Sequence, residues 1–451
     1  MSASPVRQNA PLSESLMGCA QVLLAVRGGQ SMTDALTHVP ATLRPGVQAL
    51  SFHTMRHLGW AQAIKSVLIT RTPANALLDA LLSVAFALLK PTDAASKAAL
   101  IDHETAAMPA YAPYTVVDQA VQAADNDPDL FPFKGLINGS LRRFLRERAD
   151  VEHAVARSAE ARWNHPLWWI DLVRNTYPQQ WEAVLAGAQR PAPLTLRVNR
   201  RRAKVQQVLD ALAAADIEAR AVQEVGIVVA KPRPVHLLPG FEEGWWSVQD
   251  AGAQRAAPLL AVKDGMRVLD ACAAPGGKTA HLLELAELDL LALDVDAQRL
   301  ARVGENLDRL GLRSDRVQLI SAAAQDLDAW WDGKPFDAVL ADVPCTASGI
   351  VRRHPDIRWL RRQEDVATTA RLQRRILDAL WKTVAPGGHL LYVTCSIFPA
   401  EGVRMALDFD RRHDDAQRVT SAPGQLLPVA ADTTEQTDQD GFFYALFAKQ
   451  G

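Results

Sequence analysis

The strongest constraint on the fold is an alternation of short apolar runs and amphipathic stretches, which extends from about residue 244 to the end of the chain. This alternation is typical of a parallel β-sheet whose strands are connected by helices. Six runs have the length and apolar content of strands: Met266–Cys272, Leu290–Asp294, Arg316–Ser321, Phe336–Ala341, His389–Thr394 and Gly441–Ala448. We therefore predict an α/β domain over residues 244–451, in which the polar stretch 421–440 forms a flexible loop.

Two other regions precede this domain. Residues 1–150 carry apolar positions at helical spacing, for example in Leu16–Val26 and Ala76–Leu89, so we predict an all-α domain there. Residues 151–243 begin with a helical, tryptophan-rich stretch and then alternate between strand and helix patterns, at Leu194–Asn199, Val205–Ala214 and Gly226–Ala230. This middle region is predicted to be a small α+β module.

The composition indicates the cellular location that we expect for the chain. Its four cysteines fit neither a disulfide scaffold nor the spacing of a zinc site, and we expect no metal. The first residues lack the apolar core of a signal peptide. The most apolar stretch, Ala74–Leu89, is short for a membrane span and contains Asp79. We expect a cytoplasmic protein without a membrane contact, and we expect it to be a monomer.

The formal net charge of −2 conceals local basic clusters. Residues 352–375 hold eight arginines against three acidic residues, and residues 197–204 hold five basic residues in eight positions. Such patches on a nearly neutral chain are compatible with phosphate contacts, although a solvated helix face would have the same composition.

Two cysteines each follow a predicted strand. Cys345 follows Phe336–Ala341, and Cys395 follows His389–Thr394. In an open α/β sheet, ligands bind beyond the carboxyl ends of the strands. If these strands are neighbours, with axes about 4.8 Å apart, both thiols can flank one substrate ring. This arrangement favours covalent catalysis on an electrophilic carbon over metal binding or a disulfide.

The first predicted strand runs into the sequence DACAAPGGKT, residues 270–279. Small residues let backbone amides approach a ligand, and the next helix begins with its positive end. Asp294 closes the second strand, where a carboxylate would receive a ribose diol. The spacing matches neither the dinucleotide fingerprint nor a P-loop. Together with the thiols, the pattern indicates a nucleoside cofactor.

The strings DACAAPGGKT, ADVPC and YVTCS, in this order, resemble the RNA cytosine-5 methyltransferases of the NOL1/NOP2/Sun family. Three further strings, KGLINGSLRRF, GFEEGWWSVQDAGAQ and RRHPDIRWLRR, are similar to its bacterial members that act on small-subunit (16S) ribosomal RNA. The resemblance covers nearly the whole chain. It implies a Rossmann-like class I methyltransferase domain, a NusB-like all-α domain before it, S-adenosyl-L-methionine as cofactor and ribosomal RNA as partner.

The resemblance also implies roles for site residues. Carbon 5 of cytosine is a poor nucleophile until a thiolate adds to carbon 6. By this likeness Cys395 is the nucleophile, Cys345 assists its release, and Asp342 stabilises the adduct from the edge of the base. The implied cofactor contacts are Cys272, Ala273, Ala274, Pro275, Gly276, Gly277, Lys278, Asp294 and Asp342. From the residues alone the two thiols could not be ordered, and Cys272 is expected to contribute its backbone while its side chain packs.

The basic stretch after Cys345 is expected to contact phosphates beside the target base through Arg352, Arg353, Arg358, Arg361 and Arg362. For Trp359 packing in a core is favoured over stacking on a base. The target cytosine must be unpaired or flipped out to meet a thiol, and binding should weaken with salt.

One position departs from the family pattern. Members usually carry an acid after the third strand, whereas this chain has alanine at the matching position, Ala323, and Asp326 is out of register. We predict weaker cofactor binding, by about 1.5–3 kcal/mol for one lost hydrogen bond to a charged group. Titration of an Ala323→Asp variant with the cofactor checks this, since an unchanged dissociation constant contradicts it.

Two alternatives stay open. The same chemistry could act on transfer RNA or another RNA, because no residue identifies the target. The chain could also be a non-catalytic RNA-binding factor of ribosome assembly that keeps a decayed cofactor site. The intact Cys345, Cys395 and Asp342 argue against the second alternative.

Overall fold

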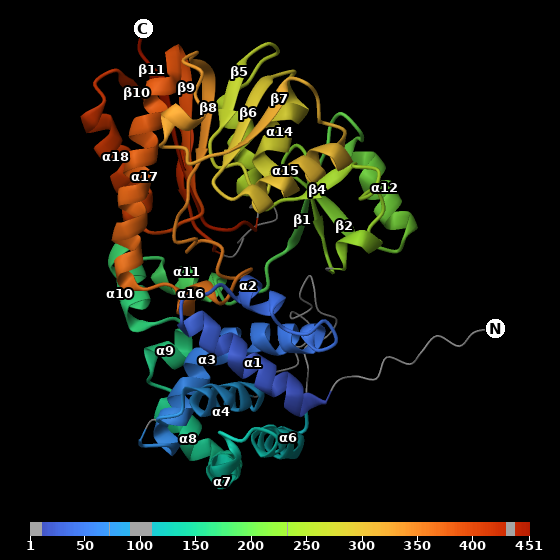
Figure 1. Ribbon diagram of the computed structural model, residues 1–451, viewed down its shortest axis with the longest axis vertical. Helices are drawn as coiled ribbons and strands as arrows, with labels where there is room; N and C mark the ends of the chain where they lie inside the picture. Colours follow the sequence, from blue (N-terminus) through green and yellow to red (C-terminus); the bar gives the residue numbers. More distant parts are fainter. Residues whose placement is uncertain (1–10, 72, 91–110, 232, 430–437) are drawn as a thin grey trace, which may run out of the picture. The chain divides into compact units, whose positions relative to one another are not determined.

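A computed structural model describes residues 11–71, 73–90, 111–231, 233–429 and 438–451 (Figure 1). The described chain divides into two compact units. The helical unit contains residues up to 175, with 189–191 and 353–362. The α/β unit contains residues 176–188, 192–352 and 363–451. Within the described ranges, no helix is both long and apolar enough to cross a membrane.

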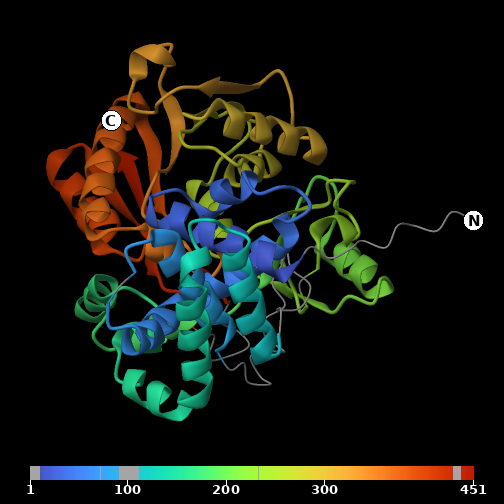
Figure 2. The ribbon, with the colours of Figure 1, turned by 60° about the horizontal axis from the view of Figure 1, so that its bottom comes forward.

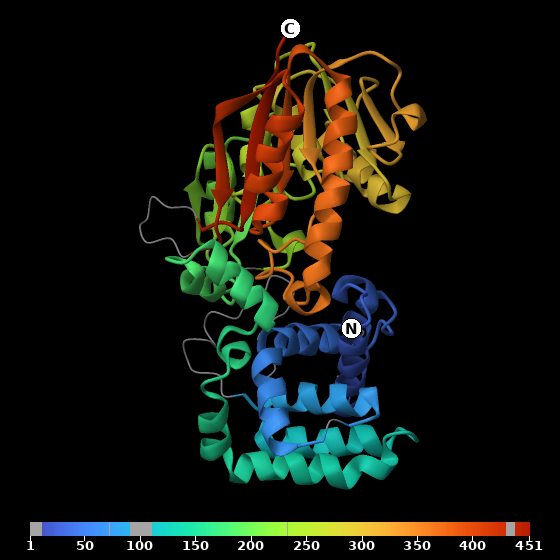
Figure 3. The ribbon, with the colours of Figure 1, turned by 90° about the vertical axis from the view of Figure 1, so that its left-hand side faces the viewer.

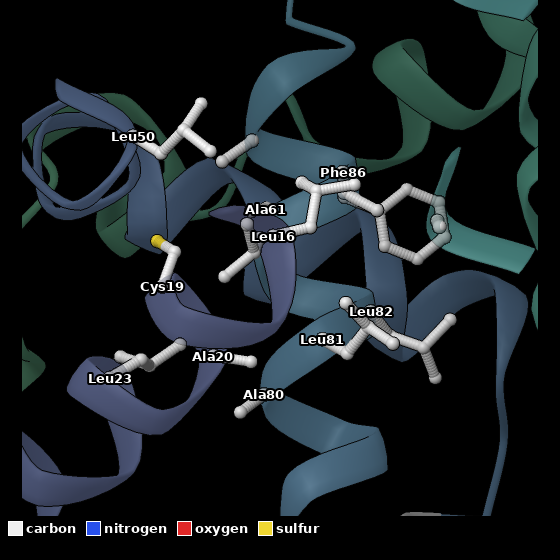
Figure 4. Close-up of a cluster of buried hydrophobic side chains, with 14 of the residues drawn as sticks. Leu16, Cys19, Ala20, Leu23, Leu50, Ala61, Ala80, Leu81, Leu82 and Phe86 are labelled. Atoms are coloured by element: carbon white, nitrogen blue, oxygen red, sulfur yellow. The ribbon is translucent and has the colours of Figure 1, made fainter. Parts of the chain in front are cut away.

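The helical unit confirms the predicted all-α region. Its helices are α1 (Leu12–Arg27), α2 (Met32–Thr37), α3 (Arg44–Leu68), α4 (Ala76–Leu88), α6 (Pro113–Asp125), η1 (Phe131–Phe133), α7 (Lys134–Arg146), α8 (Arg148–Val155), α9 (Ala159–Trp163), α10 (Leu167–Thr176) and α16 (Ile357–Leu360). Leu16, Cys19 and Leu23 of α1 pack with Leu81 and Phe86 of α4 in its core (Figure 4). Helices α6 and α7 lie side by side (Figure 2).

The segment Arg353–Arg362 is distant in sequence from the rest of the helical unit. Asp356 accepts a hydrogen bond from the backbone N–H of Met32, with 3.0 Å between N and Oδ2. Trp359 packs against the helical core, and its indole N–H donates to the carbonyl of Met55 at 3.0 Å. The preference for Trp359 as a packing residue is therefore confirmed.

Within the α/β unit, a four-stranded antiparallel sheet has the order β2-β3-β1-β4. Its strands are β1 (Leu194–Val198), β2 (Ala219–Val222), β3 (Gly226–Val229) and β4 (Trp246–Val248). The helical segments in this part of the chain are α11 (Trp181–Gly187), α12 (Val205–Ala214) and η2 (Val235–Leu237). The predicted strands β1 and β3 and the predicted helix α12 are found. Strands β2 and β4 are short, and the sequence did not indicate them.

The second sheet has the order β10-β11-β9-β8-β5-β6-β7. Strands β5 (Arg267–Asp270), β6 (Asp289–Asp294), β7 (Val317–Ser321), β8 (Phe336–Asp342) and β9 (Val384–Thr394) are parallel. Strand β11 (Phe442–Lys449) pairs antiparallel with β9 and with β10 (Ala416–Leu426). This mixed sheet confirms the Rossmann-like α/β fold.

Helices cover both faces of this sheet. One face packs on η3 (Ala253–Arg255), α13 (Ala256–Leu260), α14 (Gly277–Leu285) and α15 (Ala297–Leu310). The other packs on α17 (Gln363–Thr383) and α18 (Val403–Arg412), with the short turns η4 (Leu327–Ala329) and η5 (Pro399–Glu401) (Figure 3). Because all five parallel strands point the same way, their carboxyl ends share one rim of the sheet.

The predicted loop 421–440 is wrong in its first part, because residues 421–426 belong to β10. This strand pairs on one side only, and it mixes exposed polar side chains with the partly buried Val419, Ala422 and Leu426, which pack against the core. Pro423 and Gly424 lie where the register shifts, as expected for an edge strand. Residues 430–437 of that loop lie outside the described ranges. The predicted divisions near residues 150 and 243 stay predictions.

Candidate active site at the rim of the sheet

The two cysteines singled out by the sequence lie together. Strands β8 and β9 are neighbours, with Asp342 opposite Val393. The chain leaves both strands at the same rim of the sheet, and the sulfur atoms of Cys345 and Cys395 are 3.4 Å apart. Both side chains are half-buried. Two sulfur atoms at this separation can reach neighbouring atoms of one small ring.

The surroundings of Cys345 shift the pKa of its thiol. The pKa of Cys345 is raised well above its ordinary value, first by its hydrogen bond with Cys395 and then by burial. Cys345 therefore keeps its proton at neutral pH, and its sulfur is within hydrogen-bond distance of the sulfur of Cys395. This is the arrangement expected when one thiol attacks and the other handles a proton.

Asp342, the last residue of β8, forms an ion pair with Lys278. The distance between Nζ and Oδ2 is 2.6 Å. Burial by itself would lower the pKa of Lys278, but the charge of Asp342, its hydrogen bond and the nearby Cys395 raise it above the usual value. Lys278 is thus a cation at the start of α14, paired with the last residue of β8.

The turn after β5 has the geometry of a ligand cradle. Gly276 has φ +96°, and a Cβ there would lie 3.0 Å from Cγ1 of Val303, so glycine is needed. Thr279 donates to Asp270 at 2.7 Å, which anchors the start of α14. Burial raises the pKa of Asp270 to about 7. Of the predicted cofactor residues, Pro275 is exposed, Ala273 and Gly276 are buried, and Cys272, Ala274, Gly277 and Lys278 are half-buried.

Asp294 ends β6 beside this turn and is buried. One carboxylate oxygen accepts from the backbone N–H of Ala274 at 3.1 Å, and the other from that of Asp296 at 3.0 Å. Each oxygen keeps a second lone pair, so the carboxylate can still accept two hydroxyl groups of a ribose. The residues therefore fit a nucleoside cofactor. Ala323 is half-buried near the end of the neighbouring β7, and Asp326 is exposed.

A buried acid that sequence analysis missed lies behind the thiols. Glu401, in η5, has no exposed surface. Its carboxylate accepts hydrogen bonds from Thr346 and Ser396, the residues that directly follow the two cysteines. A hydroxyl residue after each cysteine was visible in the sequence, but nothing there connected them to an acid in a later turn.

The predicted RNA-contacting arginines have different environments. Arg352 is buried, and its guanidinium pairs with Asp440 at 2.5 Å and with Asp438 at 2.6 Å. Arg358 is also buried and donates to the carbonyl of Asn164. Burial speaks against a direct phosphate contact by these two residues. Arg353 and Arg361 are half-exposed, and Arg362 is exposed.

In the part of the chain that the structure describes, there is no cluster of three or more histidine, cysteine or acidic side chains able to hold a metal ion. The fold and the cradle between β5 and β6 define the class, which is that of Rossmann-like methyltransferases with S-adenosylmethionine as cofactor.

Comparison with known proteins identifies the family within this class. Residues 257–448 match the model described as 16S rRNA methyltransferase RsmB/F, and residues 165–236 match that described as RsmF/B-like ferredoxin-like domain. Ribosomal RNA small subunit methyltransferase B of Vibrio vulnificus is 44% identical over 324 residues, which cover 70% of this chain and 74% of that protein. The chain belongs to the 16S rRNA methyltransferase RsmB/F family.

Solved structures agree with this fold. A structure described as that of PH0851 has a TM-score of 0.72 at 24% identity, covering 96% of this chain and 99% of its own. A methyltransferase homolog protein from Pyrococcus horikoshii has a TM-score of 0.55 at 25% identity, covering 64% of this chain and 97% of its own.

Proposed function

We propose that the chain transfers a methyl group from S-adenosylmethionine to carbon 5 of a cytosine in small-subunit (16S) ribosomal RNA, through a covalent cysteine–cytosine adduct. The observation that carries the proposal is the pair of thiols, 3.4 Å apart at the carboxyl ends of adjacent strands and beside Asp342. Metal binding does not explain two thiols at such a rim, because a bound metal ion would need further ligands.

The two thiols have different roles in the proposed reaction. As a thiolate, Cys395 adds to carbon 6 and pushes the electron pair of the 5,6 double bond to carbon 5, which takes the methyl group. The cofactor supplies that methyl on a sulfonium sulfur. A base must then take the proton at carbon 5, so that the electron pair of that bond restores the 5,6 double bond while the carbon–sulfur bond breaks and Cys395 leaves as a thiolate. Cys345, next to Cys395, is the proposed base: its own proton first passes to solvent, and its thiolate, which the raised pKa makes a strong base, then accepts the proton from carbon 5.

Asp342 and Lys278 work as a pair in this proposal. Asp342 binds the edge of the base on the side of ring nitrogen 3 and the amino group, and stabilises the adduct as charge develops. Lys278 holds that carboxylate in place through the 2.6 Å ion pair and lies in the cofactor turn. The turn from Cys272 to Lys278 and the carboxylate of Asp294 hold the cofactor.

The RNA substrate is proposed from the names of the relatives, which are ribosomal RNA small subunit methyltransferases. Arg353, Arg361 and Arg362, with exposed or half-exposed side chains, are the proposed phosphate contacts of the basic stretch. Transfer RNA as substrate and a non-catalytic role in ribosome assembly are the outcomes that the test below separates.

The test incubates the protein with labelled S-adenosylmethionine and unmodified small-subunit RNA, and measures methyl transfer and adducts that survive denaturation. The parent should transfer methyl to carbon 5. Cys395→Ala should lose about a thousandfold or more in rate, and Cys345→Ala should trap the adduct. Cys19→Ala, which removes a thiol from the helical core, is the matched control.

Each other outcome has a meaning. Activity on transfer RNA alone keeps the chemistry and rejects the substrate. RNA binding without any transfer favours the assembly factor. Full activity of Cys395→Ala rejects the covalent mechanism.

A further inference from the structure

The carboxylate of Glu401 joins the two loops that carry the thiols. Oxygen Oε1 accepts from the backbone N–H of Thr346 at 2.8 Å, and Oε2 accepts from its hydroxyl at 2.5 Å. Oε2 also accepts from the hydroxyl of Ser396 at 2.6 Å. Because Thr346 follows Cys345 and Ser396 follows Cys395, one buried side chain is bonded to both loops one residue away from each sulfur.

The same residue is tied to the sheet and to α17. Oε1 accepts from the hydroxyl of Thr369 at 2.6 Å, and the backbone carbonyl accepts from Tyr392 at 2.7 Å and from Thr394 at 3.0 Å. Gln373 of α17 donates to the carbonyl of Pro344, just before Cys345, at 2.9 Å. The loops are thus fixed both to each other and to rigid elements.

Only an acceptor with two oxygens can satisfy this set of donors. The hydroxyl–carboxylate distances of 2.5–2.6 Å are those of charge-assisted bonds, which are about twice as strong as neutral ones. A glutamine in this place would turn an N–H₂ group toward donors and leave buried groups without acceptors.

We propose that Glu401 is a positioning residue that holds Cys345 and Cys395 at the separation at which both reach one cytosine ring. Their roles in that ring chemistry rest on the function proposed above, but the positioning itself does not. No hydrogen bond found in the described structure joins Glu401 to the cofactor turn or to the sulfur atoms, so the positioning acts through Thr346 and Ser396. The charge of Glu401 has a separate effect, which is to help raise the pKa of Cys345.

Disulfide formation measures the positioning without any RNA or cofactor. Diamide takes two electrons and two protons from the thiols and is reduced to the hydrazide, while the sulfurs join at about 2.05 Å. Peptide mass spectrometry follows the Cys345–Cys395 product over time. The parent should form this disulfide readily, and Glu401→Gln should form it at least about tenfold more slowly, since small errors of placement have large effects on rate.

Activity gives the second readout. In Glu401→Gln the kcat for methyl transfer should fall by about tenfold or more while KM for RNA stays within about threefold. Glu401→Asp, which keeps both oxygens, should recover part of the loss. Asp378→Asn is the control, because Asp378 pairs with Arg412 and His413 at α18 and bonds to neither loop.

If Glu401→Gln does not fold, two smaller changes replace it. Thr346→Val removes a bond from a thiol loop, and Thr369→Val removes a bond from α17 to the same carboxylate. The proposal requires the first to slow disulfide formation more than the second.

Folded variants whose disulfide rate and kcat stay within about twofold of the parent overturn the proposal. A parent that forms no Cys345–Cys395 disulfide overturns it too, because the placement it explains would be absent. If the disulfide rate responds as expected but the parent methylates no RNA, the positioning stands and the proposed function fails.

Discussion

Both units bury histidines whose pKa is lowered, but among the described residues the carboxyl groups with a raised pKa lie in the α/β unit. In the helical unit, burial lowers the pKa of His53 to about 4 and holds that of His165 well below its ordinary value. In the α/β unit, burial raises the pKa of Asp270 to about 7, although His281 there is also shifted down. Acid therefore destabilises the folded state through the buried histidines and stabilises it through Asp270, which lies before the turn after β5.

A second contrast lies within a few residues of chain. The loop with Cys345 and Arg352 makes its bonds inside the α/β unit, whereas the segment from Arg353 makes its bonds inside the helical unit. The sequence shows one continuous basic stretch, but its arginines serve two different structures. Basic composition alone therefore does not identify a nucleic-acid contact.

The largest effect is expected for Arg352→Met. It leaves the buried Asp440 and the half-buried Asp438 without their cation, which should cost about 3–5 kcal/mol in free energy of unfolding. Urea unfolding measures the loss, with Arg353→Met as control. Unchanged stability with weakened RNA binding would show instead that Arg352 contacts phosphate.

Asp270→Asn should change how the α/β unit responds to pH. The carboxyl has a pKa of about 7 when folded, against an ordinary 3.8, so the folded state gains a proton as pH falls through 7. The parent should therefore gain about 3 kcal/mol from this group between pH 8 and pH 5, and the variant should not. Hydrogen exchange of β5 and β8 at the two pH values measures the difference.

His53→Gln should have the opposite consequence in the helical unit. His53 binds a proton below pH 6.5 when unfolded but only near pH 4 when folded, so acid favours unfolding. The parent should lose about 2 kcal/mol from this group between pH 7 and pH 5, and the variant should be spared. Hydrogen exchange of α3 gives the measurement, and equal losses in both proteins would contradict the assignment.

The smallest effect is expected for Arg362→Ala. If this exposed residue contacts a phosphate, RNA affinity should fall by about 1 kcal/mol or less, and the slope of log affinity against log salt should decrease by about 0.7. Filter binding at several salt concentrations checks it. An unchanged slope would remove Arg362 from the RNA surface.

The sheet was predictable because its central strands are apolar runs, and β6, β7, β8 and β11 begin within one residue of their predicted starts. The same rule failed for β10, because this edge strand has no continuous apolar run and only a few apolar residues, among them Val419 and Leu426, pack against the core. Order along the chain also placed Cys345 and Cys395 at one rim, since each follows a strand.

The sequence could not show which residues form hydrogen bonds or ion pairs when they lie far apart along the chain. Glutamate is usually a surface residue. The burial of Glu401 is explained only by the hydroxyl groups that donate hydrogen bonds to it. Arg352 likewise gave no sign that Asp438 and Asp440 would neutralise it. Such pairings are decided by the folded topology and not by local pattern.

The segment Arg353–Arg362 belongs to the helical unit, and this affects the order of folding during synthesis on the ribosome. Residues up to 175 emerge early, but Asp356 and Trp359, which bond to Met32 and Met55, emerge only after residues 176–352 have been translated. The first unit to leave the exit tunnel is therefore completed late, and the order in which the units finish folding differs from the order in which they are made.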